Sequence, residues 1–241
     1  MTAHLGPVKF LHVPKTGGTS IAKALRVDGP HDPAVYRRTH DHDWDDAFRF
    51  TFIRNPWDQV MSWYHWDKMF VRTSFEDWVN AGMPATNRFR GNTPINQAGF
   101  FQEPGGAELV HFVGRFETLE WDFKFMCEEI LGMDVAPELP HLNATPTPIS
   151  GKARRDYVAY RYANLYTGEL WVKVESHFTE FVKRYGYPVR RPDPVVPATY
   201  QRRLQQEWRD RCDKLSLAPR QFHGYADRIP LRPIRAGGQL G

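Results

Sequence analysis

The stretch VKFLHVPKTGGTS, residues 8 to 20, joins a short apolar run to a turn with a lysine, two glycines and three hydroxyl residues. The apolar run ends at Pro14, and a nearly continuous run of this length is typical of a buried parallel strand. After the turn, Thr19 or Ser20 can cap a helix that runs to about Arg26. The stretch therefore predicts a strand, a polar turn and a helix in succession.

The same order recurs twice further along the chain. Strands are predicted over residues 8–13, 48–53 (FRFTFI) and 108–116 (ELVHFVGRF). The second is followed by the turn RNP and a helical stretch, and the third by a helical pattern over 117–131. Strands that alternate with helices in this way predict an α/β domain with a mostly parallel sheet.

Composition changes between these units and toward the C-terminus. Residues 82–106 are rich in Gly, Pro and Asn, which predicts a long surface loop with at most short helices. Residues 165–188 predict a final amphipathic helix that ends at a glycine and a proline. We therefore expect one domain over residues 1–188 and a basic, Pro/Arg-rich extension with one helix over residues 189–241.

The charge distribution bears on the class of partner. The 241 residues carry a formal charge of +4, but residues 188 to 241 hold eleven Lys/Arg against five Asp/Glu, so the remainder is negative. A basic tail on an acidic domain gives no support for nucleic-acid binding by the whole protein.

The cysteines and the length of the apolar runs indicate the cellular compartment of the protein. Cys127 and Cys212 make no disulfide framework, which favours reduced thiols. No apolar run approaches the roughly 20 residues of a membrane span, and no signal-peptide pattern is visible. A soluble, cytoplasmic protein without a transmembrane segment is expected.

The first turn has the chemistry of an anion site. Successive loop N–H groups and a helix N-terminus form a concave site for anions, and Gly17 and Gly18 let the backbone approach the ligand. Lys15 adds a mobile positive charge, while Thr19 and Ser20 add hydroxyl donors. The alternative is a tight turn whose polar residues only cap the helix. The ATP-binding pattern GxxxxGK[ST] is absent, since Lys15 precedes the glycines.

Two segments together resemble a known family. VPKTGGTS (13–20) resembles the 5′-phosphosulfate loop of sulfotransferases that use 3′-phosphoadenosine 5′-phosphosulfate (PAPS). The likeness is closest to the carbohydrate branch, which includes the heparan and chondroitin sulfotransferases and their bacterial relatives. FTFIRNPWDQVMS (50–62) resembles that family's 3′-phosphate element, and Arg54 and Ser62 have the spacing of its arginine and serine. Segments at 113–123, 139–146 and 185–188 resemble landmarks of the bacterial members.

The resemblance implies a P-loop-type three-layer fold, with a mostly parallel central sheet flanked by helices. It implies transfer of the sulfuryl group from PAPS to an acceptor hydroxyl on a carbohydrate or glycolipid, with PAP as product and no metal. It assigns Lys15 to the bridging oxygen and the leaving phosphate. The donor-binding residues that it implies are Lys15, Thr16, Gly17, Gly18, Thr19 and Ser20 for the 5′ side, and Arg54 and Ser62 for the 3′ side.

An acceptor hydroxyl also needs a base, which in this family is usually a His or Glu after the first helix. His31 aligns best with that position and is the favoured catalytic base, with His40 and His42 as alternatives. For each, a solvated loop histidine is the other interpretation. The HDHD run at 40–43 can be interpreted as a metal cluster, but a solvated charge run is favoured because no further ligands are evident.

Other side chains have two interpretations. Trp57, Trp63, Tyr64 and Trp66 share one predicted helix, so most should pack in the core, while one or two can line a nucleotide or sugar site. Gln59 stands where the family often has an arginine. Arg88 and Arg90 can bind an anionic acceptor or be simply exposed. Glu117 is expected to cap its helix or to support residues of the site, rather than to act as a base.

Two other functions remain open from the sequence. One is a P-loop kinase that uses a nucleoside triphosphate with Mg²⁺, although its lysine-after-glycine order is missing. The other is a catalytically silent nucleotide-binding or scaffolding protein that kept the loop and lost its base.

Overall fold

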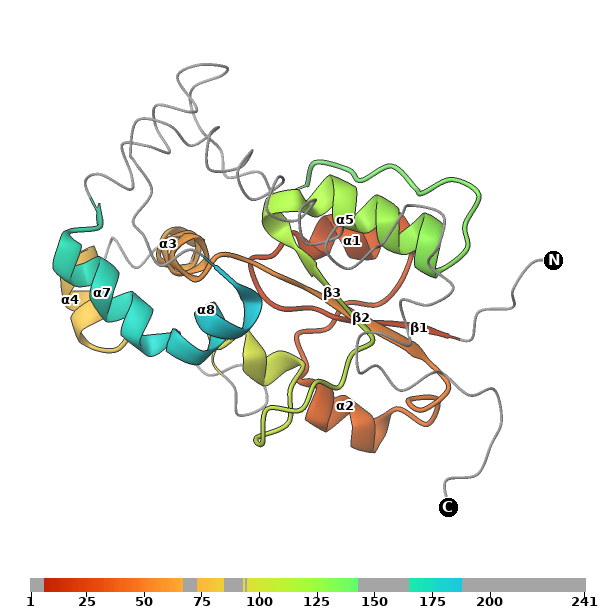
Figure 1. Cartoon of the computed structure of the whole chain (residues 1–241), viewed down its shortest axis with the longest axis horizontal. Coiled ribbons are helices and arrows are strands. Elements are labelled where there is room, and N and C mark those ends of the chain that lie inside the picture. Colours follow the sequence, from red (N-terminus) through yellow and green to blue (C-terminus); the bar gives the residue numbers. More distant parts are fainter. Residues whose placement is uncertain (1–6, 67–72, 85–92, 94, 143–164, 188–241) are drawn as a thin grey trace.

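The computed structural model describes residues 7–66, 73–84, 93, 95–142 and 165–187. In this part of the chain three strands form one sheet in the order β1-β2-β3, and both neighbouring pairs are parallel. The strands are β1 (Val8–Leu11), β2 (Phe48–Ile53) and β3 (Phe112–Arg115). Helices flank the sheet (Figure 1). The predicted α/β class with a parallel sheet is therefore confirmed.

The central strand β2 separates two hydrophobic cores. Side chains alternate between the faces of a strand, so Phe48, Phe50 and Phe52 lie in one core while Ile53 lies in the other. Thr51, on the same face as Ile53, is fully buried and satisfies its hydroxyl by donating to the Leu11 carbonyl oxygen at 2.7 Å. Burial on both faces explains why this strand is a nearly continuous apolar run.

The predicted bounds are confirmed for β2 and too long for the other two strands. β1 ends at Leu11 because the backbone N–H of Val13 donates to the Leu11 carbonyl at 3.1 Å, which turns the chain away from the sheet. β3 begins only at Phe112, since Glu108 forms an isolated antiparallel bridge with Gln102 instead of extending the parallel ladder.

The helices fall into three groups (Figure 1). One face of the sheet is covered by α1 (Gly18–Leu25) and α5 (Leu119–Phe125), and α2 (Ala34–His40) lies on the other face. The remaining α-helices lie beyond the carboxyl end of β2: α3 (Pro56–Trp66), α4 (Phe75–Asn80), α7 (Gly168–His177) and α8 (Thr179–Tyr185). The short elements are η2 (Ala98–Phe100), η3 (Phe116–Thr118) and the π-helical η4 (Met126–Ile130).

Two predicted helices are divided in the structure. The stretch 117–131 consists of η3, α5 and η4 in succession. The predicted single helix over 165–188 is wrong, because Phe178, with φ −115°, separates α7 from α8. Gly186, with φ +60°, ends α8 in the left-handed conformation that glycine adopts most easily, so the predicted stop is confirmed.

In the HDHD run the two histidines are exposed, as predicted for a solvated charge run, while the two aspartates are ion-paired. The Nζ of Lys9 lies 3.0 Å from Asp41 and 2.6 Å from Asp43, and Arg37 also pairs with Asp41 at 2.8 Å. The two aspartates therefore neutralise a lysine that β1 carries to the edge of the core. Within the residues that the structure describes, no group of three His, Cys, Asp or Glu side chains could hold a metal ion.

The described residues bear on two compartment predictions. Cys127 is a free thiol in the core with the phenylalanines of β2, and burial raises its pKa to about 12, which fits an inert structural cysteine. Cys212 lies outside the described residues. Among the helices that can be described, none combines the length and the apolar character needed to cross a membrane.

Packing of β3 on β2 requires a glycine at position 114. A Cβ there would lie 2.3 Å from the ring of Phe52, which is fully buried. We expect Gly114→Ala to lower the free energy of unfolding by about 1–3 kcal/mol, as overpacked core sites do. Gly105→Ala, where a Cβ meets nothing within 4 Å, is the matched control. Equal denaturant midpoints for the two variants would contradict this account of the core.

Candidate anion-binding site

The first turn, residues 12–17, leaves the carboxyl end of β1 and is held in shape by two hydrogen bonds. The Thr16 hydroxyl donates to the Val13 carbonyl at 2.8 Å, and the side-chain amide of Gln59 on α3 donates to the Pro14 carbonyl at 3.1 Å. Lys15 and Gly17 have φ values of +68° and +83°. Positive φ values at every second residue turn successive backbone N–H groups toward one side of the turn. This is the geometry of anion-binding nests.

The helix after the turn begins differently from the prediction. Gly17 is the N-cap of α1 and no side chain caps the helix, so the predicted cap at Thr19 or Ser20 is wrong. Thr19 is exposed in the first turn of α1. Ser20 is buried, and its Oγ accepts from the backbone N–H of Leu142 at 3.3 Å. Thr16, Thr19 and Ser20 thus differ in how open their hydroxyls are to a ligand.

Arg54 leaves the end of β2 and reaches the first turn. Its Nη1 donates to the Lys15 carbonyl at 3.1 Å, and its guanidinium lies 4.1 Å from the centre of the Phe116 ring. The Arg54 Nε is buried without a hydrogen-bond partner among the described residues. The side-chain amide of Gln97 holds the Arg54 backbone through two hydrogen bonds. Its oxygen accepts from the Arg54 N–H at 2.8 Å, and its nitrogen donates to the Arg54 carbonyl at 2.7 Å. A buried N–H without an acceptor is rare, and it favours an acceptor supplied by a ligand.

The RNP turn itself is a helix start. The Asn55 side chain accepts from the Trp57 N–H at 3.0 Å, and Pro56 occupies the first position of α3. Glu117 accepts from the Asn55 N–H at 2.5 Å and is buried, which raises the pKa of its carboxyl. Glu117 therefore positions the turn that carries Arg54, in keeping with the predicted supporting carboxylate, while no side chain caps the helix that Glu117 precedes.

One face of α3 lies toward the first turn. Gln59 bonds to Pro14, and the ring of Trp66 lies 3.9 Å from the Nζ of Lys15. Ser62 is three residues after Gln59 and four before Trp66, so helical periodicity places it on the same face. Ser62, the predicted phosphate ligand, thus lies on the face of α3 that is directed at the first turn.

Three of the four aromatic residues of α3 are buried, as predicted, and the fourth is exposed. Trp57, Trp63 and Tyr64 are buried, and Trp57 stacks on Trp171 with ring centres 4.3 Å apart. Trp66 is 59% exposed and lies against Lys15. Trp66 is therefore the member of this group that borders the site.

Lys15 and Arg54 concentrate positive charge at this edge of the sheet. Burial, and then the nearby charge of Arg54, lower the pKa of Lys15 to about 8. Within the described part of the chain, neither side chain forms an ion pair with a carboxylate. An anion bound between them would relieve both the repulsion and the lack of a counter-charge.

His31 is the one of the three candidate histidines that contacts the loop. Its Nδ1 donates to the His12 carbonyl at 2.9 Å, which leaves the lone pair on Nε2. Burial lowers the pKa of His31, and the charge of Lys15 lowers it further. His40 and His42 are exposed, and His40 stacks on Tyr36 of α2. The geometry thus favours His31 over both alternatives.

Two contributors were not identified from the sequence. His12 looks like part of the apolar run, yet its carbonyl holds His31. Gln59 was noted only as a departure from a pattern, yet it ties α3 to the first turn. Both residues act through contacts between segments that lie far apart in the sequence. The spacing of residues along the chain does not predict such contacts. Arg88 and Arg90 lie outside the described residues.

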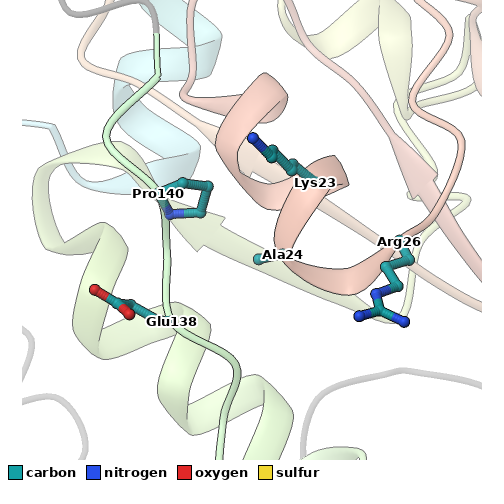
Figure 2. A pocket seen from close by; sticks show the side chains of 5 residues that line it. All are labelled: Lys23, Ala24, Arg26, Glu138 and Pro140. Atoms are coloured by element: carbon teal, nitrogen blue, oxygen red, sulfur yellow. The ribbon is translucent and has the colours of Figure 1, made fainter.

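A shallow pocket of about 380 Å³ lies elsewhere on the domain. It is lined by Lys23, Ala24 and Arg26, from the last turn of α1 and its end, and by Glu138 and Pro140 of a neighbouring segment (Figure 2). α1 begins beside the anion loop, so its last turn is roughly 10 Å farther along the helix axis. This pocket is therefore separate from the site at Lys15 and Arg54.

Comparison with protein-family models, with curated proteins and with solved structures finds no match to this chain. The likeness of the two turns to a known family therefore stays a prediction from the sequence.

The electrostatics of Lys15 can be measured directly. We expect its side chain to titrate near pH 8 in a ¹³C NMR experiment. Arg54→Ala should raise this midpoint, because the neighbouring positive charge is removed, and inorganic sulfate should raise it in the wild-type protein by stabilising the charged amine. Arg38→Ala, at an exposed ion pair with Glu103, is the control. A midpoint at the ordinary 10.5 would contradict the proposed arrangement.

Proposed function

We propose that this chain is a sulfotransferase that moves the sulfuryl group of PAPS to an acceptor hydroxyl on a carbohydrate or glycolipid. The observation that carries the proposal is the convergence of Lys15, Arg54 and His31 at the carboxyl end of β1 and β2. Two cations and a neutral histidine, supplied by three separated segments, match the needs of this reaction. The proposal includes the P-loop-type three-layer fold that the motif resemblance implies.

The residues present fit a donor with phosphates at both ends of a nucleoside. The buried Nε of Arg54 lacks an acceptor, and a phosphate oxygen would supply one. Ser62 lies on the α3 face toward the same turn. On the other side, the N–H groups of residues 16–18 and the amine of Lys15 would hold the 5′ end. In a P-loop kinase the lysine follows the glycines, so the order in this loop favours PAPS over ATP.

The reaction assigns separate roles to Lys15 and His31. In sulfuryl transfer the bond from sulfur to the bridging oxygen breaks, and a bond from sulfur to the acceptor oxygen forms. Lys15 would stabilise the negative charge that develops on the leaving phosphate oxygen. His31 would accept the acceptor's proton on Nε2, the nitrogen left with a lone pair by the bond to the His12 carbonyl. A lowered pKa keeps His31 neutral, as a base must be.

The donor class can be tested by ligand-dependent stability. PAP at 100 times its Kd should add about 2.7 kcal/mol to the free energy of unfolding, and ATP with Mg²⁺ should add much less. Arg54→Ala should abolish most of the PAP effect, whereas Arg38→Ala should keep it. Stronger stabilisation by ATP with Mg²⁺ than by PAP would favour a kinase.

The base can be tested by transfer kinetics with PAPS and a panel of carbohydrate and glycolipid acceptors. His31→Ala should lower kcat by about 10²–10⁴-fold while leaving PAP binding within about twofold, since the base acts on the acceptor. In the wild-type protein, activity should fall with acidification only below pH 6.5, because the pKa of His31 is lowered from that value.

His40→Ala and His42→Ala are the matched controls and should retain activity. Loss of transfer in either control, with an active His31→Ala, would move the base to that position. Tight PAP binding without transfer to any acceptor would instead favour the nucleotide-binding or scaffolding protein.

A further inference from the structure

His12 is a buried histidine directly after β1, and its side chain has no part in the chemistry above. Its ring Nδ1 donates to the Gly29 carbonyl at 2.9 Å. Its own carbonyl accepts from the Nδ1 of His31, also at 2.9 Å. One residue therefore holds the segment 29–31 at two points, through its side chain and through its backbone.

Three neighbours pack against the His12 ring. The ring stacks on Phe10 with centres 5.1 Å apart, and it lies 4.0 Å from the ring of His31. A Cβ on Gly18 would come within 2.0 Å of the His12 ring, so the first residue of α1 rests directly on it. The imidazole thus fills the space between the sheet, the start of α1 and the segment that carries His31.

We propose that His12 is a positioning residue, which fixes the location and the tautomer of His31 beside the anion loop. The catalytic consequence rests on the proposed function: His12 would be necessary for base catalysis and dispensable for donor binding. The claim that His12 holds His31 in place does not depend on any reaction.

The charges around the pair make the neutral form of His12 the relevant one. Burial, then the nearby His31, lower the pKa of His12 to about 4, so the ring keeps one proton, which it donates to Gly29. The groups that act on His31 are the His12 carbonyl, the Asp32 carboxylate and the Lys15 amine. Burial is the largest cause of the lowered pKa of His31. Loss of the His12 ring should therefore expose His31 and raise its pKa toward the ordinary value.

Three variants distinguish an effect on the position of His31 from an effect on the stability of the protein. His12→Phe keeps an aromatic ring and removes the bond to Gly29, while His12→Asn retains an N–H in the place of Nδ1. His111→Asn is the matched control, because His111 is equally buried and its pKa is also lowered to about 4. His111 bonds to Arg49 near the amino end of β2, away from the loop.

The deciding measurement is ¹⁵N NMR of the His31 ring. In the wild-type protein and in His111→Asn we expect a single tautomer with the proton on Nδ1. In His12→Phe we expect a tautomer mixture, with partial recovery in His12→Asn, because the bond to Gly29 is lost. In His12→Ala, which removes the ring, we also expect the His31 titration midpoint to shift to higher pH. His12→Ala provides the same test if the phenylalanine variant does not fold.

Kinetics give the second readout. His12→Phe should lower kcat about tenfold or more, as small displacements of catalytic groups do, with the Kd for PAP changed less than about threefold. His12→Asn should recover most of that loss, and the acid limb of the pH profile should follow the NMR midpoint of His31 in each variant.

The outcomes distinguish this inference from the proposed function. An unchanged tautomer and midpoint of His31 in both His12→Phe and His12→Ala would overturn the inference, whatever the activity. A wild-type protein that neither binds PAP nor transfers sulfuryl groups would overturn the proposed function, while the NMR result would still decide whether His12 positions His31.

Discussion

Parallel pairing of β1 with β2 is the constraint on which the candidate site depends. The register sets Leu11 beside Thr51, and the Thr51 hydroxyl donates to the Leu11 carbonyl inside the core. Because parallel strands end at the same edge, the turns that follow them must meet there. The bond from Arg54 to the Lys15 carbonyl is the direct result. A shift of one residue in β2 would turn its phenylalanines to the wrong face, so core packing protects the register of the site.

The two cations at this edge are stabilised without being neutralised. Lys15 lies over the Trp66 ring and Arg54 over the Phe116 ring, with centre distances of 3.9 and 4.1 Å. Aromatic faces attract a cation, by about 0.5–1 kcal/mol at exposed sites, yet they add no counter-charge. A carboxylate in either place would satisfy the cation and compete with an incoming anion. The rings therefore hold both side chains near the loop and leave the positive potential intact, in keeping with a site that receives a highly charged ligand.

Local pattern predicted the α/β class and the bounds of β2. The resemblance of two turns to a known family predicted Lys15 and Arg54 as parts of one site, and the structure brings these two residues together. Contacts between distant segments could not be predicted in the same way. The ring of His12 bonds to a carbonyl 17 residues away, and Lys9 pairs with aspartates more than 30 residues away. In the sequence His12 looks like part of an apolar run, and the two aspartates look like part of a solvated charge run.

Gln59 shows how a departure from a family pattern can be consistent with the same chemistry. Its side chain is fully buried, and its amide N–H holds the Pro14 carbonyl of the anion loop. An arginine could make this bond only by bringing a third positive charge to a loop where burial, and then the charge of Arg54, already lower the pKa of Lys15 to about 8. A further cation would lower that pKa again and leave less of Lys15 protonated at neutral pH. The neutral amide supplies the tether alone, so Lys15 keeps the proton that the proposed charge stabilisation at a leaving oxygen would require.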